Sequence, residues 1–311
     1  MSVVVRRAQP ADVSAIVALM RLGLGLGTQE RSAEVWRWKH EANPFGTSPV
    51  LVADGGDGLV AMRAFLRWDL VDEGGAVKAV RAVDTVTHPA HQGRGLFKKL
   101  TLQLCKELAD DGVDVVFNTP NAKSGAGYLK MGWRDLGRIT VWTCWSGWRR
   151  RRSSALSAAL LRDVSLPVAL VDRRLHTPVS RPFLVWRYAD APGLDYRVVA
   201  DGTALAIGRR RRRGRFWEAM ICEVLHQGDR RSVAAAARCV GDLVGALDAD
   251  YAVAVCPWAS RTSLALVGAG FVPLPRVGPR FVARPLTSRV PNRDFRQRAA
   301  WGLQLGDLEL F

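Results

Sequence analysis

The stretch VDTVTHPAHQGRGLFKKL, residues 83 to 100, decides how the first half of this chain is interpreted. It begins with the alternating pattern of a strand, passes through a turn with Gly93 and Gly95, and continues as a helix from about Leu96 to Asp110. A glycine turn at the start of a helix exposes backbone N–H groups, and the helix dipole there favours an anion. The turn is therefore either a cradle for phosphates or an ordinary connection, and the surrounding sequence must decide.

The flanking sequence places this stretch in an α/β fold. Residues 113–120, VDVVFNTP, read as a strand, and residues 123–133, KSGAGYLKMGW, read as a short helix closed by a glycine. Strand, helix and strand in this order form a βαβ unit, which implies parallel pairing. Upstream, residues 3–7 predict a strand, residues 10–22 and 33–40 two helices, and residues 48–54 and 59–68 a hairpin.

An internal repeat predicts a second, related domain. A shift of 138 residues places Val83–His88 on Ile221–His226 and Gly132–Trp133 on Gly270–Phe271. The fold class expected is therefore α/β, with two tandem domains, each a mixed, partly parallel central sheet flanked by helices. The predicted boundaries are residues 1–147 for the first domain, 148–180 for a connecting segment, 181–290 for the second domain and 291–311 for a C-terminal tail.

The composition limits the cellular compartment and the kinds of partner that are expected. The 311 residues are 48% apolar, typical of a globular core, and carry a net charge of +16, which favours an anionic partner such as a phosphorylated cofactor, a nucleic acid or a lipid surface. The five cysteines match neither a disulfide framework nor a zinc pair. No signal peptide and no transmembrane segment of about 20 apolar residues is recognised. These features predict a cytoplasmic protein.

Two motifs in the first half carry a family resemblance. Gln92 and Gly95 meet a pattern of Gln or Arg, two residues, Gly, one residue, then Gly or Ala, except that its last position is Phe97. Downstream, a second set falls at matching spacings: Asn121, Tyr128, Lys130, Gly132 and Trp133. Together they resemble the GNAT superfamily of acyl-CoA-dependent N-acyltransferases, over about residues 1 to 145 in full and over the second repeat in outline.

The resemblance implies acetyl-CoA or another acyl-CoA as co-substrate and no metal. Its pyrophosphate would meet the N–H groups of the glycine turn, and its pantetheine arm would pair with backbone near the end of the preceding strand. The cofactor-binding residues so implied are Val86, Thr87, Gln92, Gly93, Arg94, Gly95, Leu96, Phe97 and Asn121. Asn121 is also suited to cap the helix that follows it.

The resemblance further implies direct attack of an amine on the thioester, with Tyr128 as the acid that protonates the leaving sulfur. Asp84 is the candidate base because strand alternation puts it on one face with Val86. Each role has a structural alternative. Tyr128 is also suited to packing as a buried aromatic, and Asp84 is also suited to pairing with Arg63 or Arg81. A water chain is the other route for the proton.

The second repeat lacks these groups, so it is expected to be a degenerate GNAT-like domain. Under the same shift, Asp84 falls on Cys222 and Tyr128 on Leu266. Its arginine run, RRRRRGR at residues 209–215, occupies the place of a hairpin turn and predicts an exposed basic loop. Because aromatic platforms are not recognised around it, a solvated loop is favoured over a patch for nucleic acid or anionic lipid.

The function expected is N-acetyltransfer, or transfer of a related acyl group, to a primary amine of a small molecule such as an amino sugar or a secondary metabolite. The alternative is a non-catalytic GNAT-like binding protein that uses its basic surface for nucleic acid or an anionic membrane. Nucleic acid is the less favoured partner, and the sequence leaves the oligomeric state open.

Overall fold

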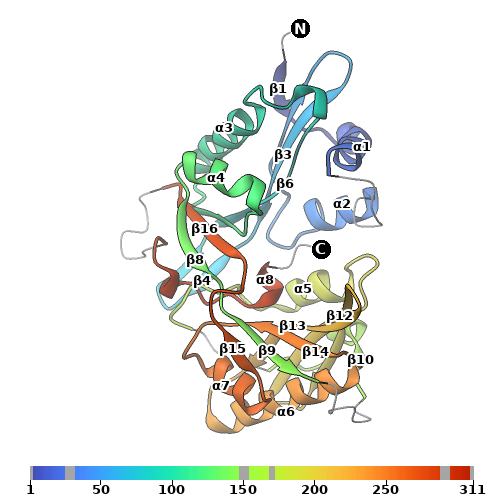
Figure 1. The fold of residues 1–311 in the computed structure, drawn as a ribbon, viewed down its shortest axis with the longest axis vertical. Helices are drawn as coiled ribbons and strands as arrows, with labels where there is room; N and C mark the ends of the chain where they lie inside the picture. Colours follow the sequence, from blue (N-terminus) through green and yellow to red (C-terminus); the bar gives the residue numbers. More distant parts are fainter. Residues whose placement is uncertain (1–2, 25–31, 147–153, 168–171, 288–294, 309–311) are drawn as a thin grey trace.

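The computed structural model describes residues 3–24, 32–146, 154–167, 172–287 and 295–308, and it contains two large sheets of seven strands each (Figure 1). The first sheet has the order β1 (Val4–Arg7), β2 (Val50–Asp54), β3 (Leu59–Arg67), β6 (Ala79–Thr87), β7 (Val115–Asn118), β16 (Arg280–Pro285) and β8 (Arg134–Arg138). The second has the order β10 (Leu156–Ser157), β11 (Arg197–Ala200), β12 (Ala204–Arg213), β13 (Phe216–His226), β14 (Tyr251–Val255), β9 (Val141–Trp145) and β15 (Val272–Leu274). A separate ribbon joins β4 (Leu70–Asp72) to β5 (Gly75–Val77).

Helices cover the sheets and fill the space between them. They are α1 (Val13–Leu24), α2 (Ala33–His40), α3 (Leu96–Asp110), α4 (Ala122–Lys130), α5 (Arg181–Leu184), α6 (Arg230–Ala246), α7 (Arg261–Gly268) and α8 (Leu305–Leu308), with a π-helical turn at Val185–Ala189 and short 3-10 turns at Pro10–Asp12, Pro89–His91, Ala158–Arg162 and Arg298–Ala300. In Figure 1, α3 and α4 lie on one side of the first sheet, α6 and α7 lie below the second, and α5 and α8 lie between the two. No helix in the described part of the chain is long and apolar enough to cross a bilayer.

Three apolar clusters hold these layers together. One joins the first sheet to α3 and α4, and another joins the second sheet to α6 and α7. The largest lies between the two sheets and takes residues from both halves, including Trp38, Trp68 and Trp186. The two halves therefore share one core on their inner faces and have separate cores on their outer faces.

Helix α3 shows why the central stretch folds as it does. Leu96, Leu100, Leu104 and Leu108 recur every four residues and are all buried, which is the apolar stripe of a helix packed on a sheet. Gly95 precedes them in the left-handed conformation, with φ of 75°. The helix therefore begins abruptly after the glycine turn, as its sequence predicts.

The expected tandem α/β fold is confirmed, and the repeat is visible in the element order. The succession β6, α3, β7, α4, β8 in the first half recurs as β13, α6, β14, α7, β15 in the second. In both halves the first and third of these elements pair in parallel. All five cysteines are buried free thiols.

The two halves exchange one strand each, which the sequence pattern did not reveal. Strand β16, from the second half, pairs antiparallel with both β7 and β8 of the first sheet. Strand β9, from the first half, pairs antiparallel with β14 and β15 of the second sheet. In Figure 1 the orange-red β16 lies beside the green β8, and the green β9 runs among orange strands. Each sheet is therefore completed by the other half of the chain.

The expectation of a loop at residues 209–215 is wrong, although residue 210 and residues 212–215 are exposed as expected. Arg209 to Arg213 are strand residues of β12, paired in register with Phe216 to Met220 of β13, and only Gly214 and Arg215 form the turn. The physical reason is a buried carboxylate on the partner strand: Glu218 accepts hydrogen bonds from both Arg211 and Arg213, so it holds two of the arginines within the sheet and balances one of their two charges.

The segments expected to connect and to trail the domains are partly packed into the molecule. The connecting segment, residues 148–180, contributes β10 to the second sheet, while its residues 148–153 and 168–171 lie outside the described part. The tail contributes α8, whose Leu308 carbonyl accepts a hydrogen bond from Arg81 of the first sheet at 3.3 Å. Its residues 291–294 and 309–311 also lie outside the described part.

Candidate functional site

Strands β6 and β7 separate after a short paired stretch. Their ladder joins only Ala79–Arg81 to Val115–Phe117, although β6 continues to Thr87. Along its other edge, β6 pairs with β3 through a register shift between Arg63 and Ala64, and Asp84 at this bulge has a positive φ of 21°. A non-glycine residue with this φ is strained, and such residues concentrate at functional sites. The first sheet is thus open on one side of β6 where Asp84 and the following residues lie.

The glycine turn stands at the end of this opening. Gly93 and Gly95 have φ of 76° and 75°, and Gln92 to Gly95 are exposed. The first N–H groups of a helix lack intrahelical partners, and Gly95 at the N-cap of α3 has no side chain to satisfy them. Gln92 donates from Nε2 to the Thr87 carbonyl at 3.4 Å, which ties the turn to the end of β6. The exposed Arg94 adds a positive charge, so the turn is suited to an anion.

Phe97, which departs from the family pattern, packs beneath the turn. Its ring meets Tyr128 edge to face at 5.5 Å between centroids. Gly127 makes room for it, since a Cβ at that position would lie 3.0 Å from the Phe97 ring. Because the side chain points into the core, the main chain of the turn stays outside.

Tyr128 is enclosed by rings and by one cation. It is 3% exposed, its ring lies 5.1 Å from that of Trp133, and the Arg63 guanidinium lies 5.5 Å from its centroid. Arg63 is fully buried over Phe65 at 4.4 Å, and none of its side-chain nitrogens has a hydrogen-bond partner among the described residues. A buried, unpaired cation favours negative charge that develops nearby.

Asp84 pairs with α2 and not with either arginine considered from the sequence. Its Oδ2 lies 2.6 Å from Lys39 Nζ and 2.9 Å from His40 Nε2. Burial alone would raise the pKa of Asp84, but the charge of Lys39 and the contacts with His40 outweigh burial and hold the pKa well below its usual range. Burial lowers the pKa of His40, so its ring is neutral near pH 7. Asp84 is therefore an ionised and weakly basic carboxylate.

The remaining candidates have local structural roles as well. Asn121 caps α4, with Oδ1 accepting from the Ser124 N–H at 2.9 Å. The Val86 side chain packs against α1 where Gly23 leaves space, because a Cβ on Gly23 would overlap Val86. Thr87 is half-buried beside the turn. The side chain of Val86 is thus committed to the core, and what it offers a ligand is its backbone.

Sequence reasoning missed Lys39 and His40, which lie 45 and 44 positions before Asp84. In the sequence, the nearby Trp36 and Trp38 could also be interpreted as the lining of an acceptor site, but the structure buries both. Trp36 and Trp38 are each 6% exposed, and Trp38 exchanges hydrogen bonds with Trp186 of the second half, at 2.7 and 2.8 Å. The only available signal was the repeated Val-Trp-Arg motif at residues 35–37 and 185–187.

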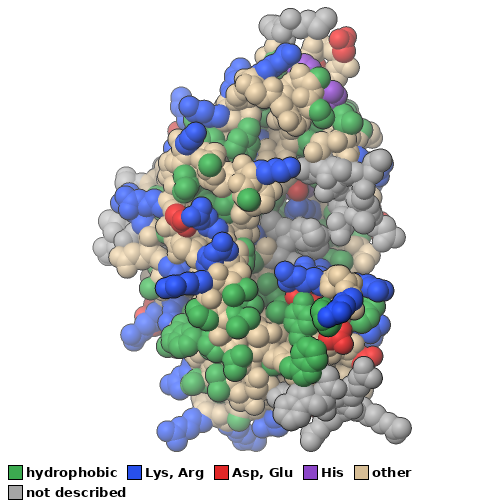
Figure 2. All heavy atoms as spheres, viewed as in Figure 1, with side chains coloured by type: hydrophobic (Ala, Val, Ile, Leu, Met, Phe, Trp, Pro, Cys, Tyr) green, Lys and Arg blue, Asp and Glu red, His purple; other side chains and the backbone are tan. Residues whose placement is uncertain are grey.

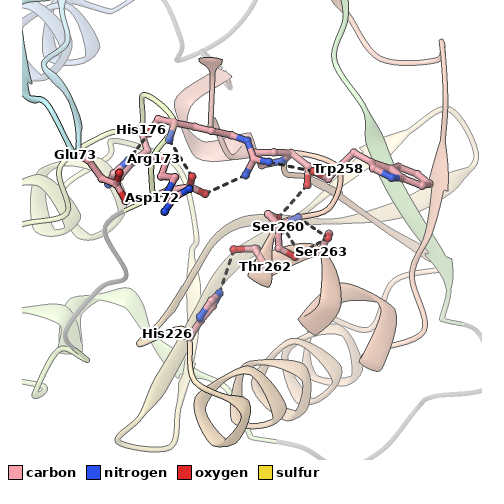
Figure 3. A network of polar contacts seen from close by, with 11 residues as sticks. Glu73, Asp172, Arg173, His176, His226, Trp258, Ser260, Thr262 and Ser263 are labelled. Atoms are coloured by element: carbon pink, nitrogen blue, oxygen red, sulfur yellow. Dashed lines mark hydrogen bonds and ion pairs between the residues drawn. The ribbon is translucent and has the colours of Figure 1, made fainter. Parts of the chain in front are cut away.

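The second half has a similar opening with different contents. Strands β13 and β14 pair only from Glu218 to Ile221, and a cavity of about 290 Å³ follows. Gln304, from the C-terminal segment, lies in this opening, accepting from Val224 N–H at 2.8 Å and donating to Val224 carbonyl at 3.2 Å. Figure 3 shows His226 pointing towards Thr262, which it contacts at 3.2 Å. The opening is thus partly filled by the chain's own side chains.

Comparison with known proteins identifies the fold family. Residues 4–135 match the acetyltransferase (GNAT) domain family. Among solved structures, a GCN5-related N-acetyltransferase from Anabaena variabilis superposes with a TM-score of 0.63 at 12% identity, covering 92% of this chain and 73% of that one. A GCN5-related N-acetyltransferase from Kribbella flavida gives 0.62 at 14%, covering 91% and 71%. No curated protein sequence matches the chain. Residues 4–135 therefore match a GNAT acetyltransferase domain, and the chain as a whole has a tandem GNAT-like fold.

Proposed function

We propose that the first half catalyses transfer of an acyl group from acetyl-CoA or a related acyl-CoA to a primary amine of a small molecule. The observation that carries the proposal is the opening beside β6, which has the uncapped start of α3 at its end and Asp84 at its bulge. Such a helix start is suited to a pyrophosphate, and an unpaired strand edge is suited to a ligand that contains amides.

The residues present fit this co-substrate. The exposed backbone from Gln92 to Gly95, the N–H groups of Leu96 and Phe97 and the charge of Arg94 would hold its phosphates. The free edge of β6 at Val86 and Thr87 would pair with its arm, with Asn121 across the opening. Acyl-CoA supplies the activated acyl group as a thioester, and the chain supplies position, charge and protons.

Tyr128 is proposed as the acid. Its aromatic surroundings fix the ring, and the Arg63 guanidinium favours negative charge near it. Protonation of the leaving thiolate by a positioned acid contributes typically about 10² to 10⁴ in rate.

Asp84 is proposed to attract and orient the acceptor amine. An ionised carboxylate at the opening favours an approaching ammonium group. Because its contacts with Lys39 and His40 keep its pKa low, direct proton abstraction by Asp84 would be slow. The proton of the acceptor amine then leaves through water, and the role of Asp84 is to bind the amine.

The test is calorimetry with acetyl-CoA and desulfo-CoA, followed by thiol release with a panel of small amines. We expect micromolar binding of both thioester and analogue, and turnover with at least one primary amine. Absence of binding to either would overturn the proposal. Binding without turnover, even with amino sugars and diamines, would favour a non-catalytic binding protein, for which the net charge of +16 is the supporting observation.

A further inference from the structure

The two faces of the β12–β13 hairpin differ in charge. On one face, Arg211 Nε and Arg213 bind the fully buried Glu218 at 2.6 and 3.1 Å, and Tyr251 donates to it at 2.9 Å. Burial raises the pKa of Glu218, but the contacts with Arg211, Tyr251 and Arg213 outweigh it and lower the pKa, so this carboxylate is ionised. Both arginines of this face therefore have an acidic partner, and that partner balances one of their two charges.

The other face and the turn carry cations without acidic partners. Arg210, Arg212 and Arg215 are exposed, and none of the three makes an ion pair with any described residue. Arg212 only donates to the Gly214 carbonyl within its own turn, at 3.3 Å. Figure 2 shows several Lys and Arg side chains, with a few acidic side chains beside them, on the part of the surface where Figure 1 labels β12.

Aromatic rings lie directly beside these cations. The Arg210 guanidinium lies 4.7 Å from the Trp217 ring, and that of Arg215 lies 4.8 Å from the Phe216 ring. Trp217 and Phe216 are 38% and 37% exposed. Contact with a ring restrains a guanidinium at the surface without neutralising it. The hairpin therefore presents fixed positive charge together with partly exposed aromatic rings, a combination not recognised in the sequence.

A hollow adjoins this face of the hairpin. It has a volume of about 580 Å³ and is lined in part by Arg210, Trp217, Arg209, Arg197 and Leu247. Arg197 is balanced by Asp195 at 2.8 Å, whereas Arg210 is not balanced. Ligand pockets typically span about 300 to 1,000 Å³, so the hollow has room for a nucleotide unit whose base stacks near Trp217.

These observations favour one class of partner. An anionic peptide would use the arginines but not the rings. A lipid surface would use both, but elements that bind a membrane surface bury an apolar face at the headgroup boundary, and the most distal residues here are Arg213, Gly214 and Arg215. A single-stranded nucleic acid offers phosphates and stackable bases together. We propose that the outer end of the β12–β13 hairpin binds single-stranded nucleic acid through Arg210, Arg212 and Trp217.

The test is fluorescence anisotropy of a labelled 12-nucleotide oligothymidylate with the full-length protein at 50 to 300 mM salt. The Arg210→Glu/Arg212→Glu variant is expected to weaken binding at least tenfold and to lower the salt slope by about 1.4, at about 0.7 for each lost phosphate contact on a single strand. Trp217→Ala is expected to weaken binding roughly 5- to 150-fold through lost stacking, and Trp217→Phe to retain most of it.

A matched control removes the same charge elsewhere in the second half. Arg230→Glu/Arg231→Glu changes two exposed arginines at the start of α6 and is expected to leave affinity within threefold of the native protein. Melting temperatures and acetyl-CoA binding of all variants verify that the fold is intact. Equal loss in the control variant, or no loss in Trp217→Ala, would overturn the proposal. So would displacement of the oligonucleotide by micromolar 5′-AMP, or tighter binding to phosphatidylglycerol vesicles than to the oligonucleotide.

Discussion

Tyr128 is held by aromatic rings and one guanidinium, which contact its ring. A substitution that removes only the hydroxyl therefore tests its chemical role without changing its packing. Tyr128→Phe keeps the contacts with Phe97, Trp133 and Arg63 and removes only the hydroxyl. We expect kcat to fall about 10²-fold or more, with acetyl-CoA affinity and melting temperature nearly unchanged. Steady-state kinetics with calorimetry measure this. An unchanged kcat would assign the tyrosine to packing alone.

For Asp84 the prediction differs, because Lys39 and His40 form ionic and hydrogen-bond contacts with its carboxylate. Asp84→Asn leaves Lys39 without an anion, and breaking a buried pair costs about 3–5 kcal/mol, less here because the Asp84 side chain is 17% exposed. We expect the KM for the amine to rise more than kcat falls. Lys39→Met is the control, since it destabilises the same pair while keeping the carboxylate. A fall in kcat without a change in KM would instead support direct proton abstraction.

The buried Glu223 side chain is expected to make the free energy of unfolding depend on pH. Burial and the nearby Asp307 carboxylate raise the pKa of Glu223 to about 8, whereas in the unfolded chain it is about 4.3. The folded state therefore holds the proton more tightly, so the stabilisation is complete below the unfolded pKa and is lost as pH rises through 8. The free energy of unfolding should fall by up to about 1.4 kcal/mol per pH unit over this window.

The measurement is the melting temperature between pH 5 and 9. Glu223→Gln resembles the protonated side chain and should flatten the decline. Glu218→Gln is the control, because contacts with Arg211, Tyr251 and Arg213 lower the pKa of Glu218 despite its burial, and its stabilisation is lost at acid pH instead. If the melting temperatures of both variants decline with pH as steeply as that of the native protein, Glu223 is not the group responsible for the pH dependence of stability.

At the scale of elements, the start of α3 depends on the left-handed conformation of Gly95. An Ala there meets no atom within 4 Å, so the cost is conformational, about 1–2 kcal/mol. We expect Gly95→Ala to weaken acetyl-CoA binding by displacing the turn. Gly56→Ala, at φ of 96° in the β2–β3 turn and equally uncrowded, should lose similar stability but no affinity. Calorimetry with thermal denaturation distinguishes the two, and equal affinities would show that the turn does not hold the cofactor.

The sequence predicted elements well where local pattern determines them. The bounds of α2 and α3 follow from apolar periodicity and from Ser32 and Gly95 at their starts. The sequence-based predictions failed where residues distant in the chain determine the structure. The arginine run forms a strand because Glu218 across the ladder pairs with two of its arginines, and Asp84 pairs with a lysine 45 residues away. Strands β9 and β16 carry apolar patterns that fit either sheet, so no local signal reports their exchange.

At the scale of the whole molecule, the exchanged strands make the two halves depend on each other. Phe281, Val282 and Ala283 of β16 are almost fully buried in the first sheet, and Arg284 donates to the Met131 carbonyl at 2.8 Å. In return, Trp142 and Cys144 of β9 lie in the core of the second sheet. The inner faces also share a core, so we infer that the second half is needed to complete the fold of the first.

This dependence predicts the behaviour of the separated halves. A fragment of residues 1–147 has an unpaired β9 and lacks β16 between β7 and β8, which leaves two open strand edges. We expect it to aggregate and to bind no acetyl-CoA. Co-expression with residues 148–311 should restore a soluble complex, because each fragment supplies the strand that the other lacks. The control is a full-length chain nicked at a protease site inserted after residue 147, which should keep one cooperative unfolding transition and bind as the intact chain does. A soluble 1–147 fragment with native acetyl-CoA affinity would show that the first half folds and functions without the exchanged strand.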